Sequence, residues 1–263
     1  MKKSWSVLTL LWLSLSTPVY AQVPPQTQQA LVVVTESWDA VKGRLQRLER
    51  SAQGPWQAVG QAVPIVVGKK GMGWGRGLFQ LDEPQADYRR EGDKRAPAGV
   101  FSLGSVFGLA TVPQAQQWLT LHMPYIHLSP TVRCIGDAPS RYYNEIHDTR
   151  NIQRDWLHDE NNENMRRDAI RDEGAYRWGV FVEHNTTNAF QARDKISGSC
   201  IFLHIWKGDG SGTSGCTAMA QSDLLNVINW LDARKHPVLI QLPQTVYRDY
   251  QAQWHLPPLS LAP

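Results

Sequence analysis

The sequence lacks a large net charge and is sparing with charged residues. Its 263 residues include 27 Lys and Arg against 24 Asp and Glu, and charged residues make up 19% of the chain. Without Lys2 and Lys3, which lie in an acid-free segment of 21 residues at the N-terminus, 25 basic and 24 acidic residues remain. Nucleic-acid binding needs a basic face that neutralises phosphates, so this balance gives no electrostatic case for a nucleic-acid partner.

Long apolar runs are also missing beyond the N-terminus, where the chain has the pattern of an export signal. Lys2 and Lys3 precede a short apolar segment at 7–15, and Val19-Tyr20-Ala21 follows as a cleavage site. A polar Ser-Thr-Pro segment ends the apolar run too early for it to span a membrane. We therefore expect residues 1–21 to be removed on export and the processed chain to have no membrane span.

Cysteine is scarce, with only Cys134, Cys200 and Cys216 in the chain. An exported chain with an odd number of Cys retains one after pairing. A disulfide between Cys134 and Cys200 would leave Cys216 as a reactive thiol, although sequence alone does not establish that the first two approach within bonding distance. A zinc site built from Cys200, His204 and Cys216 lacks a fourth ligand and the C-x2-C spacing, so we expect no metal.

A glycine-rich run at 68–77 invites comparison with phosphate-binding loops. A Walker loop needs G-K-S/T at the start of a helix, and the dinucleotide fingerprint needs a strand before it and a helix after it. Here the next segment is polar and contains Pro84, which blocks a helix. The run instead predicts a hairpin turn near a substrate groove.

The stretch 199–219 carries the strongest chemical signal. An apolar, β-prone run ends near His204, a glycine-rich turn follows, and Cys216 comes after Gly215. A hairpin over this stretch would let the imidazole take the thiol proton and leave a nucleophilic thiolate. Gly215, which has no Cβ, would let the turn present backbone N–H groups to an oxyanion. The alternative is a buried structural Cys and a satisfied core His.

His204 and the segment Thr213-Ser214-Gly215-Cys216-Thr217-Ala218 resemble the active-site motif of the L,D-transpeptidase (YkuD) family, in which a His precedes S-x-G-C. The resemblance implies Cys216 as nucleophile, His204 as general base, and the backbone amides of Gly215 and Cys216 as the oxyanion hole. The spacing is shorter than in most members, and Ala218 replaces the Arg of S-x-G-C-x-R. The segment 96–101, Ala-Pro-Ala-Gly-Val-Phe, is similar to the family's T-P-x-G-x-F element and is expected to frame the cleft.

The resemblance implies acyl transfer on peptidoglycan stem peptides in the bacterial periplasm, without a cofactor. The thiol would attack the L,D peptide bond between the third and fourth residues of the stem. The thioester would pass to an amine, giving a 3-3 cross-link or amino-acid exchange, or to water, giving L,D-carboxypeptidase activity. Ser214, Thr217 and Trp206 are the expected substrate contacts. Because Ala218 cannot bind a carboxylate, Arg141 or Arg177 is expected to do so.

The resemblance covers about residues 60–242 and implies a β-rich α+β fold, with a β-sandwich-like catalytic domain. The polar, Arg-rich segment at about 130–178 is expected to be a helical or loop insertion, either solvated or acting as a lid. The expected organisation is a signal peptide at 1–21, an N-terminal strand and helix region at 22–58, the catalytic domain at 59–245, and a tail at 246–263.

Apolar periodicity and turn residues predict the local elements. Ser222 and Asp223 are expected to cap a helix that begins soon after Cys216, and its N-terminus would favour a thiolate. The predicted elements are strands at 31–35, 56–67, 118–126, 179–184 and 237–242, helices at 38–50 and 218–233, a turn at Pro97 and Gly99, and a loop at 107–115.

Two other functions compete with this prediction. A papain-like peptidase places Cys before His and carries a C-G-S-C-W-like signature, which is absent. A cell-wall binding protein with a decayed site would keep an aromatic groove without needing a thiolate, but the presence of both Cys216 and His204 counts against decay. His184, which ends a predicted strand, is expected to be structural.

Overall fold

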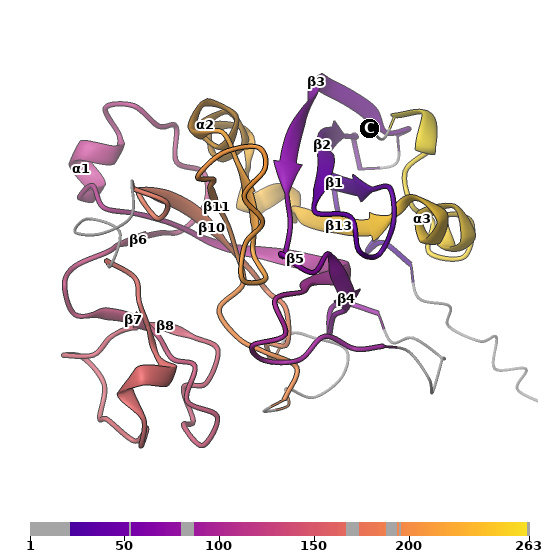
Figure 1. Cartoon of the computed structure of the whole chain (residues 1–263). Coiled ribbons are helices and arrows are strands. Elements are labelled where there is room, and N and C mark those ends of the chain that lie inside the picture. Colours follow the sequence, from indigo (N-terminus) through magenta and orange to yellow (C-terminus); the bar gives the residue numbers. More distant parts are fainter. Residues whose placement is uncertain are drawn as a thin grey trace, which may run out of the picture.

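The computed structural model describes residues 22–52, 54–79, 87–166, 174–187, 194 and 196–261, so the predicted signal at 1–21 lies outside the described residues. The chain is β-rich with few helices, as predicted (Figure 1). The strands are β1 (Gln29–Thr35), β2 (Lys42–Glu49), β3 (Gln57–Val66), β4 (Met72–Trp74), β5 (Ala96–Gly108), β6 (Tyr125–His127), β7 (Val132–Cys134), β8 (Ile146–Asp148), β9 (Glu163–Asn164), β10 (Trp178–Val182), β11 (Phe202–Ile205), β12 (Thr217–Met219) and β13 (Val238–Pro243). The helices are α1 (Val112–Ala115), α2 (Gln221–Trp230) and α3 (Gln244–Tyr250), with 3-10 turns η1 (Asp159–Asn161), η3 (Ala233–Lys235) and η4 (Leu259–Leu261).

Ten strands form one mixed sheet that closes on itself. The order is β10-β11-β12-β3-β2-β1-β13-β5-β4, with β6 on β5, and β10 also pairs with β5. This additional pairing joins β10, at one end of the strand path, to β5, the strand next to the other end, so the sheet closes. Closure removes most exposed strand edges, which would otherwise offer unpaired backbone groups to other chains.

The centre of the core is β1, and all seven of its residues are buried. It pairs in parallel with β13 and antiparallel with β2, so the N-terminal region predicted at 22–58 contributes strands to the main sheet. A continuous apolar run such as Leu31-Val32-Val33-Val34 is typical of a strand covered on both faces. The predicted strands at 31–35, 56–67, 179–184 and 237–242 are confirmed as β1, β3, β10 and β13.

The helix predicted at 38–50 is wrong, because this segment forms β2. Trp38, Val41, Leu45 and Leu48 recur at helical spacing, which misled the prediction. In the fold, β2 is hydrogen-bonded along both edges, to β1 and to β3. Pairing on both sides overrides a weak local preference for helix, as tertiary context commonly does.

Two further local predictions are corrected around β5. Pro97 and Gly99 lie inside the 13-residue strand β5 and do not form a turn. The turn precedes them, where the Asp93 N–H donates to the Arg90 carbonyl. The predicted loop at 107–115 begins inside β5 and includes the short helix α1, and the strand predicted at 118–126 reduces to β6 near its end.

The helix predicted at 218–233 is confirmed as the shorter α2, which buries Leu224, Val227 and Ile228. Its N-cap is Ala220, which has no side-chain cap, so the predicted capping by Ser222 and Asp223 is wrong. The strand β12 intervenes between Cys216 and this helix. The thiol therefore does not sit directly before a helix N-terminus, and the dipole argument for a thiolate does not hold.

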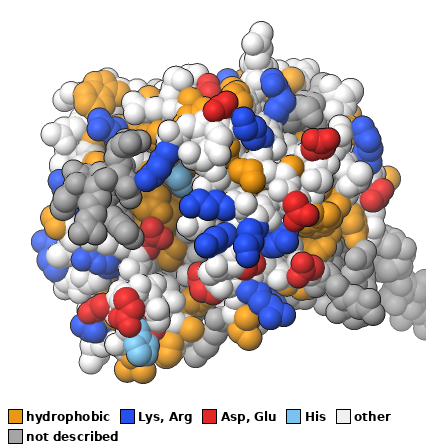
Figure 2. Space-filling view, viewed as in Figure 1, with side chains coloured by type: hydrophobic (Ala, Val, Ile, Leu, Met, Phe, Trp, Pro, Cys, Tyr) orange, Lys and Arg blue, Asp and Glu red, His pale blue; other side chains and the backbone are white. Residues whose placement is uncertain are grey.

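The predicted insertion at 130–178 carries its own three-stranded sheet, in the order β8-β7-β9. Its described residues form no α-helix, only the 3-10 turn η1, so the helical part of the prediction is wrong. Positive and negative side chains are interspersed over the face of the molecule in Figure 2.

Among the described residues, no helix is long and apolar enough to cross a membrane.

Candidate active site

His204 and Cys216 are brought together by two neighbouring strands. His204 lies in β11, where the flanking Phe202, Leu203 and Ile205 are buried, and Cys216 directly precedes β12. These strands pair in parallel, with His204 opposite Ala218. Both His204 and Cys216 line one cavity of about 930 Å³. The apolar run thus fixes the strand, and the strand pairing carries the two side chains to a shared space.

The connection from β11 to β12 is a crossover and not the predicted hairpin. On one edge β12 pairs in parallel with β11, so the two strands run in the same direction. On its other edge β12 pairs antiparallel with β3, so it lies between β11 and β3.

The glycine-rich run at 68–77 contacts this connection. Gly68 and Gly71 form a tight turn, and Lys69 N–H donates to the Thr213 carbonyl at 2.8 Å. Lys69 also lines the cavity, so the predicted turn does lie beside it.

Thr213 organises the turn before Cys216. Its Oγ1 donates to the Cys216 carbonyl at 2.6 Å and accepts from the Gly215 N–H at 3.0 Å. The Gly215 φ of +148° belongs to the region that L-residues rarely adopt. The Gly215 N–H, predicted as an oxyanion donor, is thus already engaged in the free protein. This leaves the Cys216 N–H as the stronger candidate for that role.

The Cys216 side chain is a buried neutral thiol. Sγ accepts from the Phe202 N–H at 3.3 Å and lies 3.7 Å from the Cys200 carbonyl, to which it donates. Burial raises the pKa of the Cys216 thiol to about 12, with the carboxylate of Glu163 acting in the same direction and the cation of Arg89 opposing it. At neutral pH the group is therefore a thiol.

His204 is held in the tautomer that a general base requires. Its Nδ1 lies 2.8 Å from the Ile205 carbonyl, and a carbonyl only accepts, so Nδ1 carries the proton and Nε2 is an acceptor. Burial lowers the pKa of His204 to about 4. The ring packs edge-on against Tyr176 at 5.5 Å between centroids, and the Tyr176 hydroxyl donates to Glu163 at 2.8 Å. A backbone carbonyl and an aromatic ring thus orient the imidazole without an acidic partner.

Two of the five predicted substrate contacts, Ser214 and Trp206, also line this cavity. The predicted oxyanion-hole residue Gly215 and the neighbouring Ala218 line it as well. Thr217 does not, because its buried hydroxyl donates to Gln241 at 2.6 Å in the interior.

The predicted carboxylate ligands Arg141 and Arg177 are not among the cavity-lining residues. Arg141 pairs with Asp155 at 3.4 Å and lies over the ring of Tyr142. The Arg177 side chain lies near Gly174. Neither guanidinium shares the space of the thiol in this structure.

The cavity has charged walls that the sequence prediction missed. The positive residues Lys42, Lys69, Arg89 and Lys207 line it together with the negative residues Glu91, Glu160 and Glu163. None belongs to the motif around Cys216, and no local pattern distinguishes them from ordinary surface charges. Only the strand arrangement shows that they face one space.

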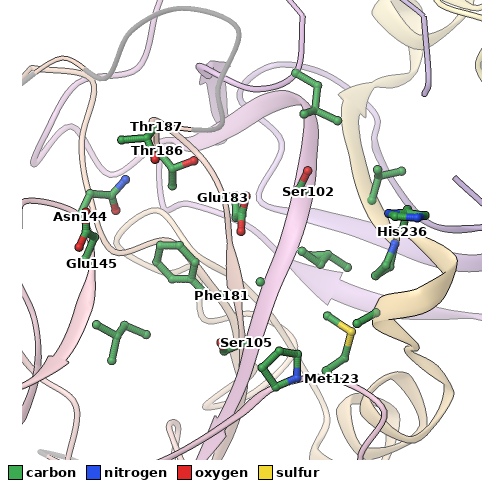
Figure 3. Close-up of a pocket in the computed structure, with 18 of the residues that line it drawn as sticks. Ser102, Ser105, Met123, Asn144, Glu145, Phe181, Glu183, Thr186, Thr187 and His236 are labelled. Carbon is green, nitrogen blue, oxygen red and sulfur yellow. The ribbon is translucent and has the colours of Figure 1, made fainter. Parts of the chain in front are cut away.

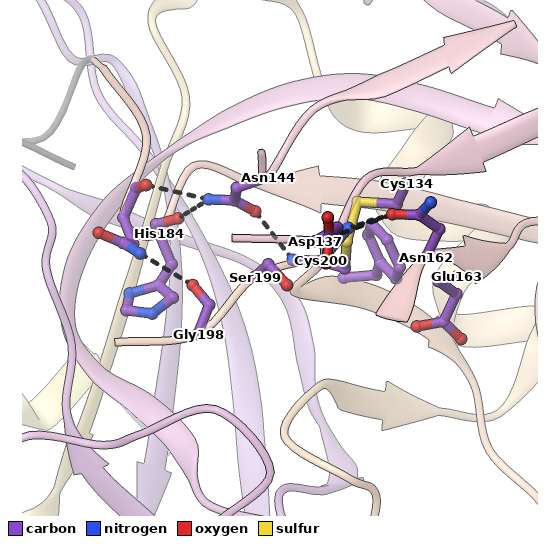
Figure 4. Close-up of a disulfide and its surroundings, with 12 residues drawn as sticks. Cys134, Asp137, Asn144, Asn162, Glu163, His184, Gly198, Ser199 and Cys200 are labelled. Atoms are coloured by element: carbon purple, nitrogen blue, oxygen red, sulfur yellow. Dashed lines mark hydrogen bonds between the residues drawn. A yellow bond between two sulfur atoms is a disulfide. The ribbon is translucent and has the colours of Figure 1, made fainter. Parts of the chain in front are cut away.

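The disulfide predicted between Cys134 and Cys200 is present, with Cα atoms 6.0 Å apart, and Cys216 is free. The disulfide connects β7 of the insertion to the segment before β11 (Figure 4). Asn144 adds a second link: its Oδ1 accepts from Cys200 N–H, and its Nδ2 donates to the carbonyls of His184 and Asn185. The insertion is thereby fixed beside the cavity, which Cys200 also lines.

His184 is a structural residue. It is fully buried, its Nδ1 accepts from the Arg76 N–H, and its Nε2 donates to the Ser197 carbonyl at 2.9 Å. Burial lowers the pKa of His184 to about 3, so the ring is neutral. It does not line the cavity of Cys216.

A second cavity of about 710 Å³ contains none of the predicted site residues. Figure 3 shows Phe181 and Glu183 around the same space as Ser102 and Ser105 of β5. Asn144 lines this cavity and hydrogen-bonds to Cys200 of the first, so it lies between the two. Cys216 and His204 do not line this second cavity.

The described part of the chain contains no group of three or more His, Cys, Asp or Glu residues arranged to hold a metal ion. Comparison with known proteins finds no matching protein-family model and no matching curated protein.

Proposed function

We propose that this protein is an exported cysteine acyltransferase of the L,D-transpeptidase type, acting on peptidoglycan stem peptides in the periplasm. The observation that carries the proposal is the cavity shared by His204 of β11 and Cys216, which directly precedes the parallel strand β12. The tautomer of His204 adds support, because its unprotonated Nε2 is the atom that a base uses. The disulfide supports export, since such bonds persist in oxidising compartments.

The proposed reaction begins when Cys216 Sγ attacks the carbonyl carbon of the L,D bond between the third and fourth stem residues. His204 Nε2 takes the thiol proton, and the Cys216 N–H stabilises the oxyanion of the tetrahedral intermediate. The carbon–nitrogen bond breaks, His204 returns the proton to the leaving amine, and a thioester remains. An amine or water then attacks the thioester, and the thiol is restored.

The proton transfer must accompany attack on the substrate. With the pKa of Cys216 at about 12 and that of His204 at about 4, the thiolate–imidazolium pair is not stable in the free site. Substrate binding changes this balance when the developing charge is stabilised at the transition state, which is where catalysis gains. We therefore expect the thiol of the free protein to react slowly with small electrophiles at neutral pH.

The test is mass spectrometry of the processed protein with a disaccharide tetrapeptide. Wild type is expected to release the terminal D-Ala or form a 3-3 dimer, while Cys216→Ala abolishes turnover and keeps the fold. Loss of D-Ala alone identifies the carboxypeptidase, and a dimer or exchanged residue identifies the transpeptidase. Unchanged substrate that remains bound to the protein would favour a wall-binding role, and full activity of Cys216→Ala would refute the mechanism.

A further inference from the structure

Arg89 is a buried cation beside the turn that carries the nucleophile. Its side chain is 2% exposed, and the residue lines the cavity of Cys216 and His204. A Cβ placed on Gly215 would lie 3.6 Å from Arg89 Nη2, so the guanidinium is next to the residue that precedes Cys216. Its charge also reaches the thiol, where it opposes the effect of burial.

The guanidinium has fewer acceptors than its charge and burial require. Nη1 donates to the Ser197 carbonyl at 3.1 Å and Nη2 to the Arg90 carbonyl at 3.2 Å. Within the described ranges, Nε has no acceptor. His184 Nε2 lies 3.4 Å from Nη1, but it donates its own proton to Ser197 and cannot accept another.

The anionic groups around Arg89 are distant or engaged elsewhere. Asp93 pairs with Nη2 only at 3.8 Å. Glu91 directs Oε2 at Ser199, whose N–H and Oγ donate to it at 2.8 and 2.9 Å. A buried cation without a close carboxylate and with an unused N–H is stabilised by an anion that enters from the cavity.

We propose that Arg89 binds the terminal carboxylate of the substrate residue that follows the scissile bond. The inference rests on the proposed function, in which Cys216 attacks the carbonyl of the third residue and the fourth bears the free carboxylate. Ala218 lines the cavity without a donor, and Arg141 and Arg177 do not line it. Arg89 therefore takes the role that the sequence prediction gave to an Arg of the insertion.

This assignment predicts selectivity for a free C-terminus directly after the scissile bond. A carboxylate forms charge-assisted hydrogen bonds with a guanidinium, whereas a C-terminal amide brings no anion to the buried cation. We expect kcat/KM for a tetrapeptide acid to exceed that for its C-terminal amide by about tenfold or more.

The experiment compares these two peptides, which differ only in the terminal group, in four proteins: wild type, Arg89→Gln, Arg89→Lys and Arg76→Gln. Arg76 is the matched control. Its Nε also donates a hydrogen bond to Ser197, in this case to the hydroxyl Oγ, but Arg76 does not line the cavity. The acid-to-amide ratio is expected to fall to near 1 in Arg89→Gln, to be intermediate in Arg89→Lys, and to stay at the wild-type value in Arg76→Gln. Circular dichroism and thermal melting check that each variant is folded.

Calorimetric binding of the same peptides to Cys216→Ala, with and without Arg89→Gln, separates this inference from turnover. Selective binding of the acid that depends on Arg89 supports the inference even if wild type turns neither peptide over, which would refute only the proposed function. A wild-type acid-to-amide ratio of kcat/KM near 1 overturns the inference even if the Arg89 variants fail to fold. A retained ratio in folded Arg89→Gln, or no binding of either peptide, also overturns it.

Discussion

At the residue scale, the two groups that carry the proposed chemistry are both neutral in the free protein. Burial disfavours the charged form of each group, so it raises the pKa of Cys216 and lowers that of His204. Cysteine sites that are activated in advance instead have a thiol pKa lowered by a nearby cation or helix terminus. Here the neighbouring Arg89 opposes burial but does not overcome it.

The first prediction concerns the reactivity of this thiol. The rate of Cys216 alkylation by iodoacetamide, followed by mass spectrometry, is expected to rise about tenfold per pH unit from pH 7 to 10, because only the thiolate reacts and its pKa is about 12. Cys134 and Cys200 are disulfide-bonded, so Cys216→Ala should remain unlabelled. A plateau between pH 5 and 7 would reveal a preformed thiolate–imidazolium pair and contradict this account.

At the element scale, the crossover between β11 and β12 sets the position of Cys216, the proposed nucleophile. Its last turn depends on the hydrogen bonds of Thr213 and on a backbone conformation at Gly215 that other residues rarely adopt. The first part of the same connection is open, because a Cβ at Gly210 would meet nothing within 4 Å. Comparing an alanine substitution at Gly215 with one at Gly210 therefore separates the effect of backbone strain from that of an added methyl group.

Gly215→Ala is expected to destabilise the fold by about 1 to 3 kcal/mol, because it forces an unfavourable φ and brings its Cβ to 3.1 Å from the Arg95 carbonyl. Turnover of the stem peptide should fall more than the loss of folded protein explains, since the turn carries the attacking atom. Gly210→Ala should match wild type in both measurements. Equal effects of the two substitutions in denaturant melts and activity assays would argue against a strained catalytic turn.

At the scale of the whole molecule, a buried neutral histidine links stability to pH. The His184 ring links Arg76, just after β4, to Ser197, and its pKa falls to about 3 in the folded chain because the ring is buried. In the unfolded chain His184 has the ordinary histidine pKa of about 6.5. The stability that the neutral ring contributes is therefore fully present above that pH. It is lost as pH falls from about 6.5 toward 3.

We expect the free energy of unfolding to fall by about 2 to 3 kcal/mol from this residue alone between pH 6.5 and 4.5. Urea denaturation at several pH values measures the slope. His184→Gln lowers stability at every pH but removes the titrating group, so its slope should be shallower by about 1.4 kcal/mol per pH unit. An unchanged slope in a folded His184→Gln variant would mean that the folded state protonates this ring readily.

The limits of prediction from the sequence follow from the range of each interaction. His204, Cys216 and Gly215 lie within one short stretch, so their spacing was visible, and the free state of Cys216 followed once Cys134 and Cys200 were paired. Arg89 is more than a hundred residues from Cys216, and nothing local marks a buried guanidinium. Thr217 was predicted at the substrate site because of its place in the motif, but strand alternation turns its hydroxyl toward Gln241.

By itself, the sequence determined the strands β1, β3, β10 and β13, the helix α2, and the Cys and His on which the proposed chemistry depends, and the resemblance of its motif implied the β-rich class. These depend on apolar runs, periodicity and short motifs, which are local. Only the tertiary structure decided that 42–49 is a strand, that β11 and β12 run parallel, and that Arg89 lies beside Gly215. Those outcomes depend on hydrogen bonding and packing between distant segments, which form only when the closed sheet brings them together.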